Sequence, residues 1–95
     1  MKIPKLHYIS RGSSVTEHID NILKACSNGA ELVQLRLKNY SLEAVLEAGF
    51  EARRITSEHD VILIINDHYK VAKQVRADGV HLGKNDACPA VVRRF

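Results

Sequence analysis

An amide and a carboxylate, Asn66 and Asp67, directly follow an unbroken apolar run at 61–65. Such a short run, rich in β-branched residues and without alternation, is typical of a strand buried on both faces of a parallel sheet. In parallel α/β folds, the chemistry takes place at the carboxyl ends of the strands. We therefore predict a functional role for Asn66 and Asp67. The alternative is structural, with Asp67 capping a helix that begins at His68.

A second carboxylate, Asp86, lies just beyond the predicted strand 80–82, as Asp67 lies beyond the preceding strand. Neighbouring parallel strands are about 4.8 Å apart, so two carboxylates at equivalent strand ends can share one hard cation. Magnesium is typically bound by one or two carboxylates together with water and substrate phosphates. We therefore expect Asp67 and Asp86 to face one cleft and to bind Mg²⁺. The alternative for Asp86 is a role in a turn or at a helix start.

Polar and apolar side chains alternate along the predicted strand 32–38. The alternation places Gln34, Arg36 and Lys38 on one face of the strand and the apolar residues on the other. Both faces of a parallel sheet are normally covered, so two cations and an amide would be costly there without partners. A barrel interior that opens towards its mouth and holds an anionic ligand removes this cost. An edge strand with a solvated face is the alternative.

The elements that position these residues alternate between strand and helix. A capping box begins a helix at Ser14, the Asn28-Gly29 pair ends it, and Ser41 begins a second helix. The expected strands are 6–10, 32–38, 61–65 and 80–82, and the later expected helices are 41–58, 68–75 and one that begins near Pro89. This order predicts a parallel sheet built from right-handed βαβ units.

The number of elements limits the architecture. A complete (β/α)₈ barrel needs roughly 200 residues or more, whereas this sequence has 95. The chain is therefore either a small open sheet or the front part of a longer barrel.

Composition and charge limit the class of protein. The chain is 45% hydrophobic and 26% charged, which is ordinary for a soluble globular protein. Without an apolar run that could span a bilayer or serve as a signal peptide, we expect a cytoplasmic protein with no membrane partner. A net charge of +3 suits anionic ligands, but the basic residues are scattered among only 5% aromatics, so we expect no nucleic-acid partner. Cys26 and Cys88 form no CxxC pair and should be reduced thiols.

Three segments resemble the signature motifs of the thiamin phosphate synthase family, also called thiamin phosphate pyrophosphorylase. Residues 34–38, Gln-Leu-Arg-Leu-Lys, resemble its QxRxK motif, and residues 65–67 resemble its ND motif after the third strand. Residues 77–83, followed by Asp86, resemble its ADGVHLGQxD block. The order and spacing agree over essentially all 95 residues.

The resemblance implies an enzyme that joins hydroxymethylpyrimidine diphosphate to thiazole phosphate, with release of pyrophosphate. The implied fold class is α/β, with parallel βα repeats that form the first half of a TIM (β/α)₈ barrel, so that residues 1–95 are a single partial domain with strands 1–4. The residues that would bind the pyrimidine diphosphate are Gln34, Arg36, Lys38 and Asn66. Asp67 and Asp86 would hold Mg²⁺. Arg36 and Lys38 would also assist catalysis by neutralising the departing pyrophosphate.

Two departures from the family pattern keep other functions open. Leu37 stands where the family usually has Glu, and Lys84-Asn85 stand where it has Gln-Glu. One alternative is a thiazole tautomerase-like paralogue of the same fold, which tends to lose the Gln, the Lys and the metal carboxylates. The other is a non-catalytic truncated half-barrel, which should form a homo-oligomer or aggregate because its sheet would be exposed. The isolated chain is expected to be inactive, because in the family later strands hold the thiazole phosphate.

Overall fold

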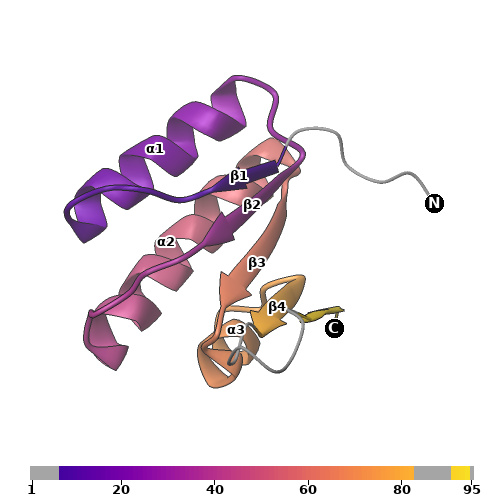
Figure 1. Cartoon of the computed structure of the whole chain (residues 1–95). Helices are drawn as coiled ribbons and strands as arrows, with labels where there is room; N and C mark the ends of the chain where they lie inside the picture. Colours follow the sequence, from indigo (N-terminus) through magenta and orange to yellow (C-terminus); the bar gives the residue numbers. More distant parts are fainter. Residues whose placement is uncertain (1–6, 83–90, 95) are drawn as a thin grey trace.

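The computed structural model describes residues 7–82 and the backbone of residues 91–94. Strands and helices alternate along the chain (Figure 1), with the bounds β1 (His7–Ile9), α1 (Val15–Ser27), β2 (Leu32–Leu35), α2 (Leu42–His59), β3 (Ile62–Asn66), α3 (Tyr69–Gln74), β4 (Gly79–Leu82) and β5 (Val91–Arg94). The sheet order is β1-β2-β3-β4-β5, and β1 to β4 run parallel. The predicted α/β class with parallel βα repeats is therefore confirmed.

Side-chain hydroxyls begin the two longer helices, as their sequences predict. The Ser14 Oγ accepts a hydrogen bond from the Glu17 N–H at 3.2 Å, and the Ser41 Oγ accepts one from the Ala44 N–H at 3.1 Å. The Glu17 carboxylate accepts in turn from the N–H and the hydroxyl of Ser13 rather than from Ser14. Each cap satisfies an amide that has no partner inside its helix, which is typically worth about 1 kcal/mol.

The core lies between the sheet and the described helices, which all cover one face of it (Figure 1). The register pairs Val33 with Leu63 and Leu35 with Ile65, and all four side chains are at most 1% exposed. The helices contribute Ile22 and Cys26 from α1, Val45, Ala48, Ala52 and Ile55 from α2, and Val71 and Val75 from α3. None of the described helices is long and apolar enough to cross a membrane.

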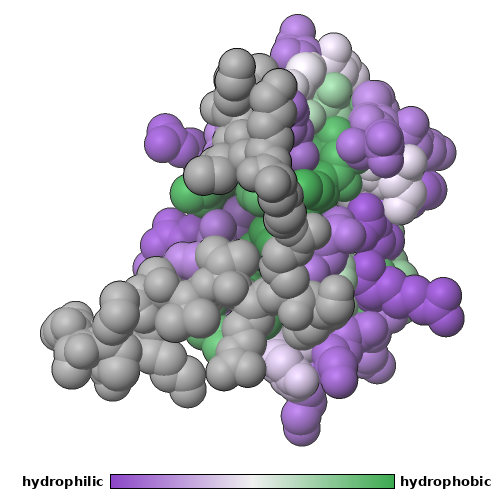
Figure 2. Space-filling view, turned by 90° about the vertical axis from the view of Figure 1, so that its right-hand side faces the viewer, coloured by the Kyte–Doolittle hydropathy of each residue, from purple (hydrophilic) through white to green (hydrophobic). Residues whose placement is uncertain are grey.

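The opposite face of the sheet is not covered by any described helix. The register aligns Ile9, Gln34, Ile64 and Gly79 across this open face. Ile9 is 47% exposed. Figure 2 shows the molecule from the right-hand side of Figure 1, where some hydrophobic residues are visible among hydrophilic ones. In a barrel, the face of each strand that points away from the helices lies inside. Parallel strands with helices on one face only are the arrangement expected of the first strands of a TIM barrel.

One local prediction and one structural alternative are wrong. A helix was expected near Pro89, which lies outside the described residues, but residues 91–94 form β5, which pairs antiparallel with β4. The β-branched pair Val91-Val92 favours a strand, and the outer edge of β4 offers unpaired backbone groups to it. Asp67 is also not the N-cap of the third helix, since α3 begins at Tyr69 with His68 at its N-cap.

Candidate active site

The carboxyl ends of β1 to β4 bring the polar residues to one edge of the sheet. Ser10 to Gly12 follow β1, and Arg36 and Lys38 follow β2. Asn66 ends β3, and His81 lies near the end of β4. Because the strands are parallel, these residues meet at the edge where parallel α/β proteins bind ligands.

The alternation along the second strand has the predicted effect on packing. Val33, Leu35 and Leu37 are buried in the helix-side core, whereas Gln34 aligns with Ile9 and Ile64 on the open face. The strand is shorter than expected and ends at Leu35. Arg36 and Lys38 therefore lie just beyond the sheet, with exposed side chains.

Arg36 and Lys38 line one cavity of about 310 Å³ together with residues that follow β1. The complete lining is Ser10, Arg11, Gly12, His18, Arg36, Lys38 and Tyr40. Arg11 thus adds a cation that the sequence did not suggest. Within the described part of the chain, none of these basic side chains forms an ion pair with a carboxylate. The cavity is therefore positively charged and suited to an anion.

A buried polar network forms the wall of this cavity. Ser10 and His18 are only 4% and 5% exposed, and the Ser10 Oγ lies 2.7 Å from the His18 Nδ1. The same hydroxyl accepts a hydrogen bond from the Arg36 N–H at 2.9 Å. The Tyr40 ring meets the His18 ring edge to face, with centroids 6.3 Å apart.

The protonation state of His18 follows from its burial. Desolvation lowers the pKa of His18 below its usual 6.5, and a backbone hydrogen bond to Gly12 and the charge of Glu17 oppose this effect only in part. The imidazole is therefore neutral at pH 7. Because the Arg36 N–H can only donate to the Ser10 Oγ, the serine hydroxyl is free to donate to the His18 Nδ1.

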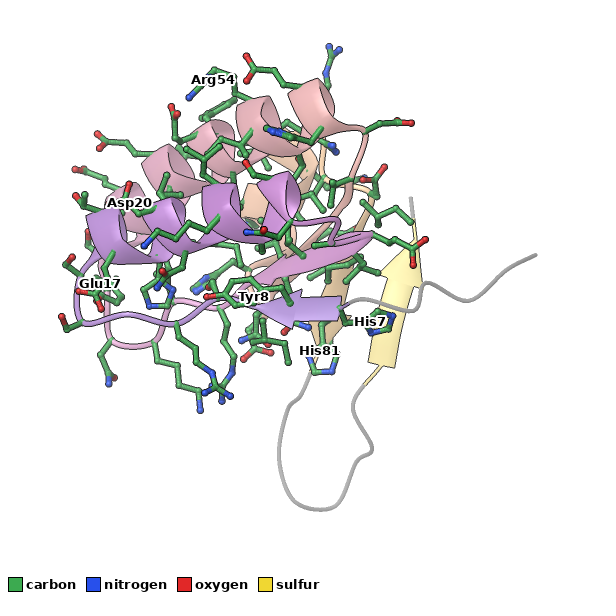
Figure 3. The ribbon with its side chains drawn as sticks, turned by 90° about the horizontal axis from the view of Figure 1, so that it is seen from above. His7, Tyr8, Glu17, Asp20, Arg54 and His81 are labelled. Carbon is green, nitrogen blue, oxygen red and sulfur yellow. The ribbon has the colours of Figure 1, made fainter. Side chains whose placement is uncertain are left out.

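A second group of polar residues lies at the ends of β3 and β4. The Asn66 amide nitrogen donates to the Asp67 Oδ2 at 3.2 Å, and the Asn66 Oδ1 lies 3.2 Å from the His81 Nδ1. Figure 3 shows His81 on the side of the sheet that faces away from the helices. The bonds to Asp67 and His81 fix both ends of the Asn66 side-chain amide, which is buried.

Asp67 has an unusual backbone conformation at this edge. Its φ is +62°, and the His68 N–H donates across it to the Asn66 carbonyl oxygen at 2.8 Å. A bond between residues two apart around a positive φ is that of a γ-turn, a strained form. Asp tolerates this left-handed region better than most residues. The turn exposes the Asp67 side chain at the edge of the sheet.

The described residues include one of the two carboxylates that are predicted to hold Mg²⁺. Asp86 lies outside them, so its distance to Asp67 stays a prediction. Among the described residues, no group of three or more His, Cys, Asp or Glu side chains could hold a metal ion. An exposed carboxylate that leaves most positions to water and phosphate suits Mg²⁺, which is rarely enclosed by protein ligands alone.

Asp78 has a structural position at the amino ends of the strands. Its Oδ2 accepts from the Leu63 N–H at 2.8 Å and from the Arg53 guanidinium at 3.1 Å. This part of the Ala77-Asp78-Gly79 segment therefore joins β4 to the start of β3 and to α2, away from the cavity.

Comparison with known proteins identifies the family. The family model described as thiamine monophosphate synthase (TMP-TENI) matches residues 6–95. The chain belongs to this family. It is 42% identical over 82 residues to the thiamine-phosphate synthase of Flavobacterium psychrophilum, an alignment that covers 86% of this chain and 40% of that protein. It is also 38% identical over 84 residues to the thiamine biosynthesis bifunctional protein ThiED of Geobacter sulfurreducens, covering 84% of this chain and 17% of that protein.

The fold agrees with a solved member of the family. The thiamine phosphate pyrophosphorylase from Pyrococcus furiosus superposes with a TM-score of 0.76 and 31% sequence identity. The superposition covers 88% of this chain and 41% of that structure. The chain thus spans about two fifths of the length of these thiamine phosphate synthases.

Sequence reasoning missed His18 as a residue of the site. The signal was its spacing, since His18, Ile22 and Cys26 recur every four residues on the buried side of α1. A histidine on such a face is buried and needs a polar partner. Ser10 supplies that partner from the end of β1.

Proposed function

We propose that the protein to which this chain belongs is a thiamin phosphate synthase. It would join hydroxymethylpyrimidine diphosphate to thiazole phosphate, release pyrophosphate and form thiamin phosphate. The observation that carries this proposal is the cavity at the ends of β1 and β2, in which Arg11, Arg36 and Lys38 have no described carboxylate partner. A diphosphate supplies the missing negative charge.

In this proposal, residues in or directly after two strands, β2 and β3, bind the pyrimidine diphosphate. Gln34 would bind it from the open face, Arg36 and Lys38 from the cavity, and Asn66 from the end of β3. Asp67 and Asp86 would hold Mg²⁺. The exposed Asp67 carboxylate supports this role, as does the Asn66 amide that donates to one of its oxygens.

The chemistry asks the protein mainly to position reactants and to neutralise charge. As the bond to pyrophosphate breaks, the pyrimidine carbon gains positive charge and the leaving group gains negative charge. Arg36 and Lys38 would bind the departing pyrophosphate, which lowers the barrier because their charges are already in place. The thiazole nitrogen then attacks the carbon, so no covalent enzyme nucleophile is needed. Mg²⁺, when bound, adds further charge neutralisation.

The reaction also defines the partners. We propose small molecules as the substrates, with neither nucleic acid nor a membrane as a partner, and a cytoplasmic location.

The test is a product assay on the full-length protein with Mg²⁺ and both substrates. We expect thiamin phosphate and pyrophosphate in equal amounts. The same assay should follow isomerisation of a thiazole carboxylate phosphate, the reaction of a tautomerase. Isomerisation without coupling would refute the synthase assignment, and the absence of both reactions would favour a non-catalytic half-barrel.

A further inference from the structure

The parallel ladder between β1 and β2 is altered at its last step. The Ser10 N–H donates to the Gln34 carbonyl oxygen at 2.9 Å, as a regular parallel pair requires. The next bond of such a ladder would join the Arg36 N–H to the Ser10 carbonyl oxygen. Instead, the Arg36 N–H donates to the Ser10 hydroxyl at 2.9 Å. A side chain thus replaces a backbone acceptor where the chain enters the cationic cavity.

The Ser10 hydroxyl is in turn held by α1. The His18 Nδ1 lies 2.7 Å from it, and both side chains are buried. The loop after β1 passes close over this helix, since a Cβ on Gly12 would lie 2.9 Å from the Glu17 Cβ and 3.0 Å from the His18 nitrogen. The first turns of α1 are therefore fixed against the ends of both strands.

We propose that His18 is a positioning residue for the diphosphate site, acting through the Ser10 hydroxyl on the backbone of Arg36. The proposal rests on the proposed function for the identity of the anion, but its geometry is independent of the reaction. Neither His18 nor Ser10 needs to react. Their task is to set the direction in which the chain leaves β2, and with it the positions of Arg36 and Lys38.

Charge gives this positioning a purpose. Arg11, Arg36 and Lys38 line the same cavity and repel one another when no anion is bound. A fixed backbone beneath Arg36 limits how far the exposed side chains of Arg36 and Lys38 can move apart. A site that binds a diphosphate tightly needs its first contacts held by buried, hydrogen-bonded neighbours. Ser10 and His18 are the buried side chains of the cavity lining.

The experiment uses the full-length protein and three variants. His18→Leu and Ser10→Ala remove either end of the hydrogen bond. His18→Asn keeps a polar atom at the position of Nδ1 and is the conservative variant. Binding of inorganic pyrophosphate with Mg²⁺ is measured by calorimetry, and hydrogen exchange at the Arg36 amide is measured by NMR.

We expect His18→Leu and Ser10→Ala to bind pyrophosphate about tenfold more weakly, because a lost buried hydrogen bond frees the Arg36 backbone. Exchange at the Arg36 amide should be faster in both. His18→Asn should stay within about threefold of the wild type in affinity and should keep the amide protected. If His18→Leu does not fold, Ser10→Ala carries the test alone.

Ile55→Val is the matched control, since it loosens the same core from α2 without touching the cavity. It should lower the melting temperature and leave pyrophosphate affinity unchanged. The proposal is overturned if this control weakens binding as much as His18→Leu, if His18→Asn is as weak as His18→Leu, or if the wild type binds no pyrophosphate. A wild type that binds pyrophosphate in this pattern but forms no thiamin phosphate would refute the proposed function and support the positioning role.

Discussion

At the scale of single residues, Asp67 combines an exposed carboxylate with a strained backbone. Strained residues persist only where the surrounding structure maintains them, and they cluster at functional sites. Ala is a poor substitute here, since its side chain disfavours the positive φ of +62°. Asn tolerates this conformation and removes only the charge. The structure thus offers a substitution that separates function from folding.

We predict that Asp67→Asn lowers kcat/KM of the full-length enzyme by about 100-fold, because the metal loses a carboxylate where charge develops. Its melting temperature should stay close to that of the wild type. Asp20→Asn, on the exposed side of α1, is the control and should change neither value. Steady-state kinetics at saturating Mg²⁺ make the measurement, and full activity of Asp67→Asn would contradict the metal role.

Lys38 tests the cationic cavity. Lys38→Ala should reduce kcat/KM by about 100-fold, since a cation that meets the charge developing on a leaving group contributes several kcal/mol. Lys24→Ala is the matched control, because Lys24 is an exposed lysine in the last turn of α1, far from the cavity. Lys38→Ala should lower kcat/KM, and Lys24→Ala should leave it unchanged. Equal kinetics for the two variants would show that Lys38 does not contact the substrate.

His18 gives a pH dependence of stability. Burial lowers its pKa in the folded state, so below pH 6.5 the unfolded chain binds the proton more readily. The contribution of the neutral His18 imidazole to the free energy of unfolding is therefore complete above pH 6.5. It is lost as the pH falls through the lower pKa of the folded state. We predict that chemical denaturation of the wild type shows a greater loss of stability between pH 7.5 and pH 5 than His18→Asn does. Parallel curves for the two proteins would contradict the assignment of a buried neutral imidazole.

The sequence predicts the place of those residues whose position follows from the local pattern of apolar and polar side chains. Asn66 and Asp67 end a strand, and that end could be read from the apolar run before them. His18 was missed because its burial depends on a serine eight positions earlier and on the approach of β2. Such a network depends on tertiary packing, which local pattern does not describe.

At the scale of elements, the carboxyl and amino ends of the strands have different roles. At the amino ends, opposite the cavity, Asp78 joins β3, β4 and α2 through the Leu63 amide and Arg53. Its bonds stabilise the fold without contributing to the cavity lining. Changes there should therefore affect stability rather than substrate binding.

We predict that Asp78→Ala lowers the free energy of unfolding by about 1–3 kcal/mol, because the part-buried Leu63 amide loses its side-chain acceptor and the Arg53 guanidinium loses its ion pair. The KM for the pyrimidine diphosphate should stay unchanged. Asp20→Ala, an exposed aspartate of α1, should change stability by less than about 0.5 kcal/mol. Equal stabilities of the two variants, measured by denaturant unfolding, would contradict this structural role.

The elements themselves were mostly predictable, and the failures have physical causes. Caps at Ser14 and Ser41 are local, so both helix starts were correct. β2 ends early because the Ser10 hydroxyl takes the Arg36 amide away from the ladder. β5 was missed because residues 91–94 form a strand only by pairing with the free edge of β4. The local sequence contains no turn signal that predicts this pairing.

At the scale of the whole molecule, the open face of the sheet determines how the chain behaves. In the family member from Pyrococcus furiosus, the matched region is 41% of the chain. Ile9, 47% exposed, lies on the face that a complete barrel would enclose. Four strands were countable from the sequence, but closure of a barrel depends on strands that pair with their edges. The order of elements predicted either a small open sheet or the front part of a barrel, and the family resemblance favoured the half-barrel.

We predict that the isolated 95-residue chain self-associates and forms no thiamin phosphate. Ile9 is 47% exposed on the face that no described helix covers, and a second copy can cover it. The residues that would hold the thiazole phosphate are expected in later strands. Light scattering after size exclusion should give a mass above the 10.7 kDa of one chain. A stable monomer that forms product would contradict both parts.

A crystal structure of the full-length protein with Mg²⁺ and pyrophosphate would show directly whether the carboxyl ends of these strands bind the diphosphate. We expect pyrophosphate oxygens within hydrogen-bonding distance of Arg36 and Lys38, with the metal bound by Asp67 and Asp86. Pyrophosphate bound elsewhere, with Arg36 and Lys38 free in solvent, would refute this site.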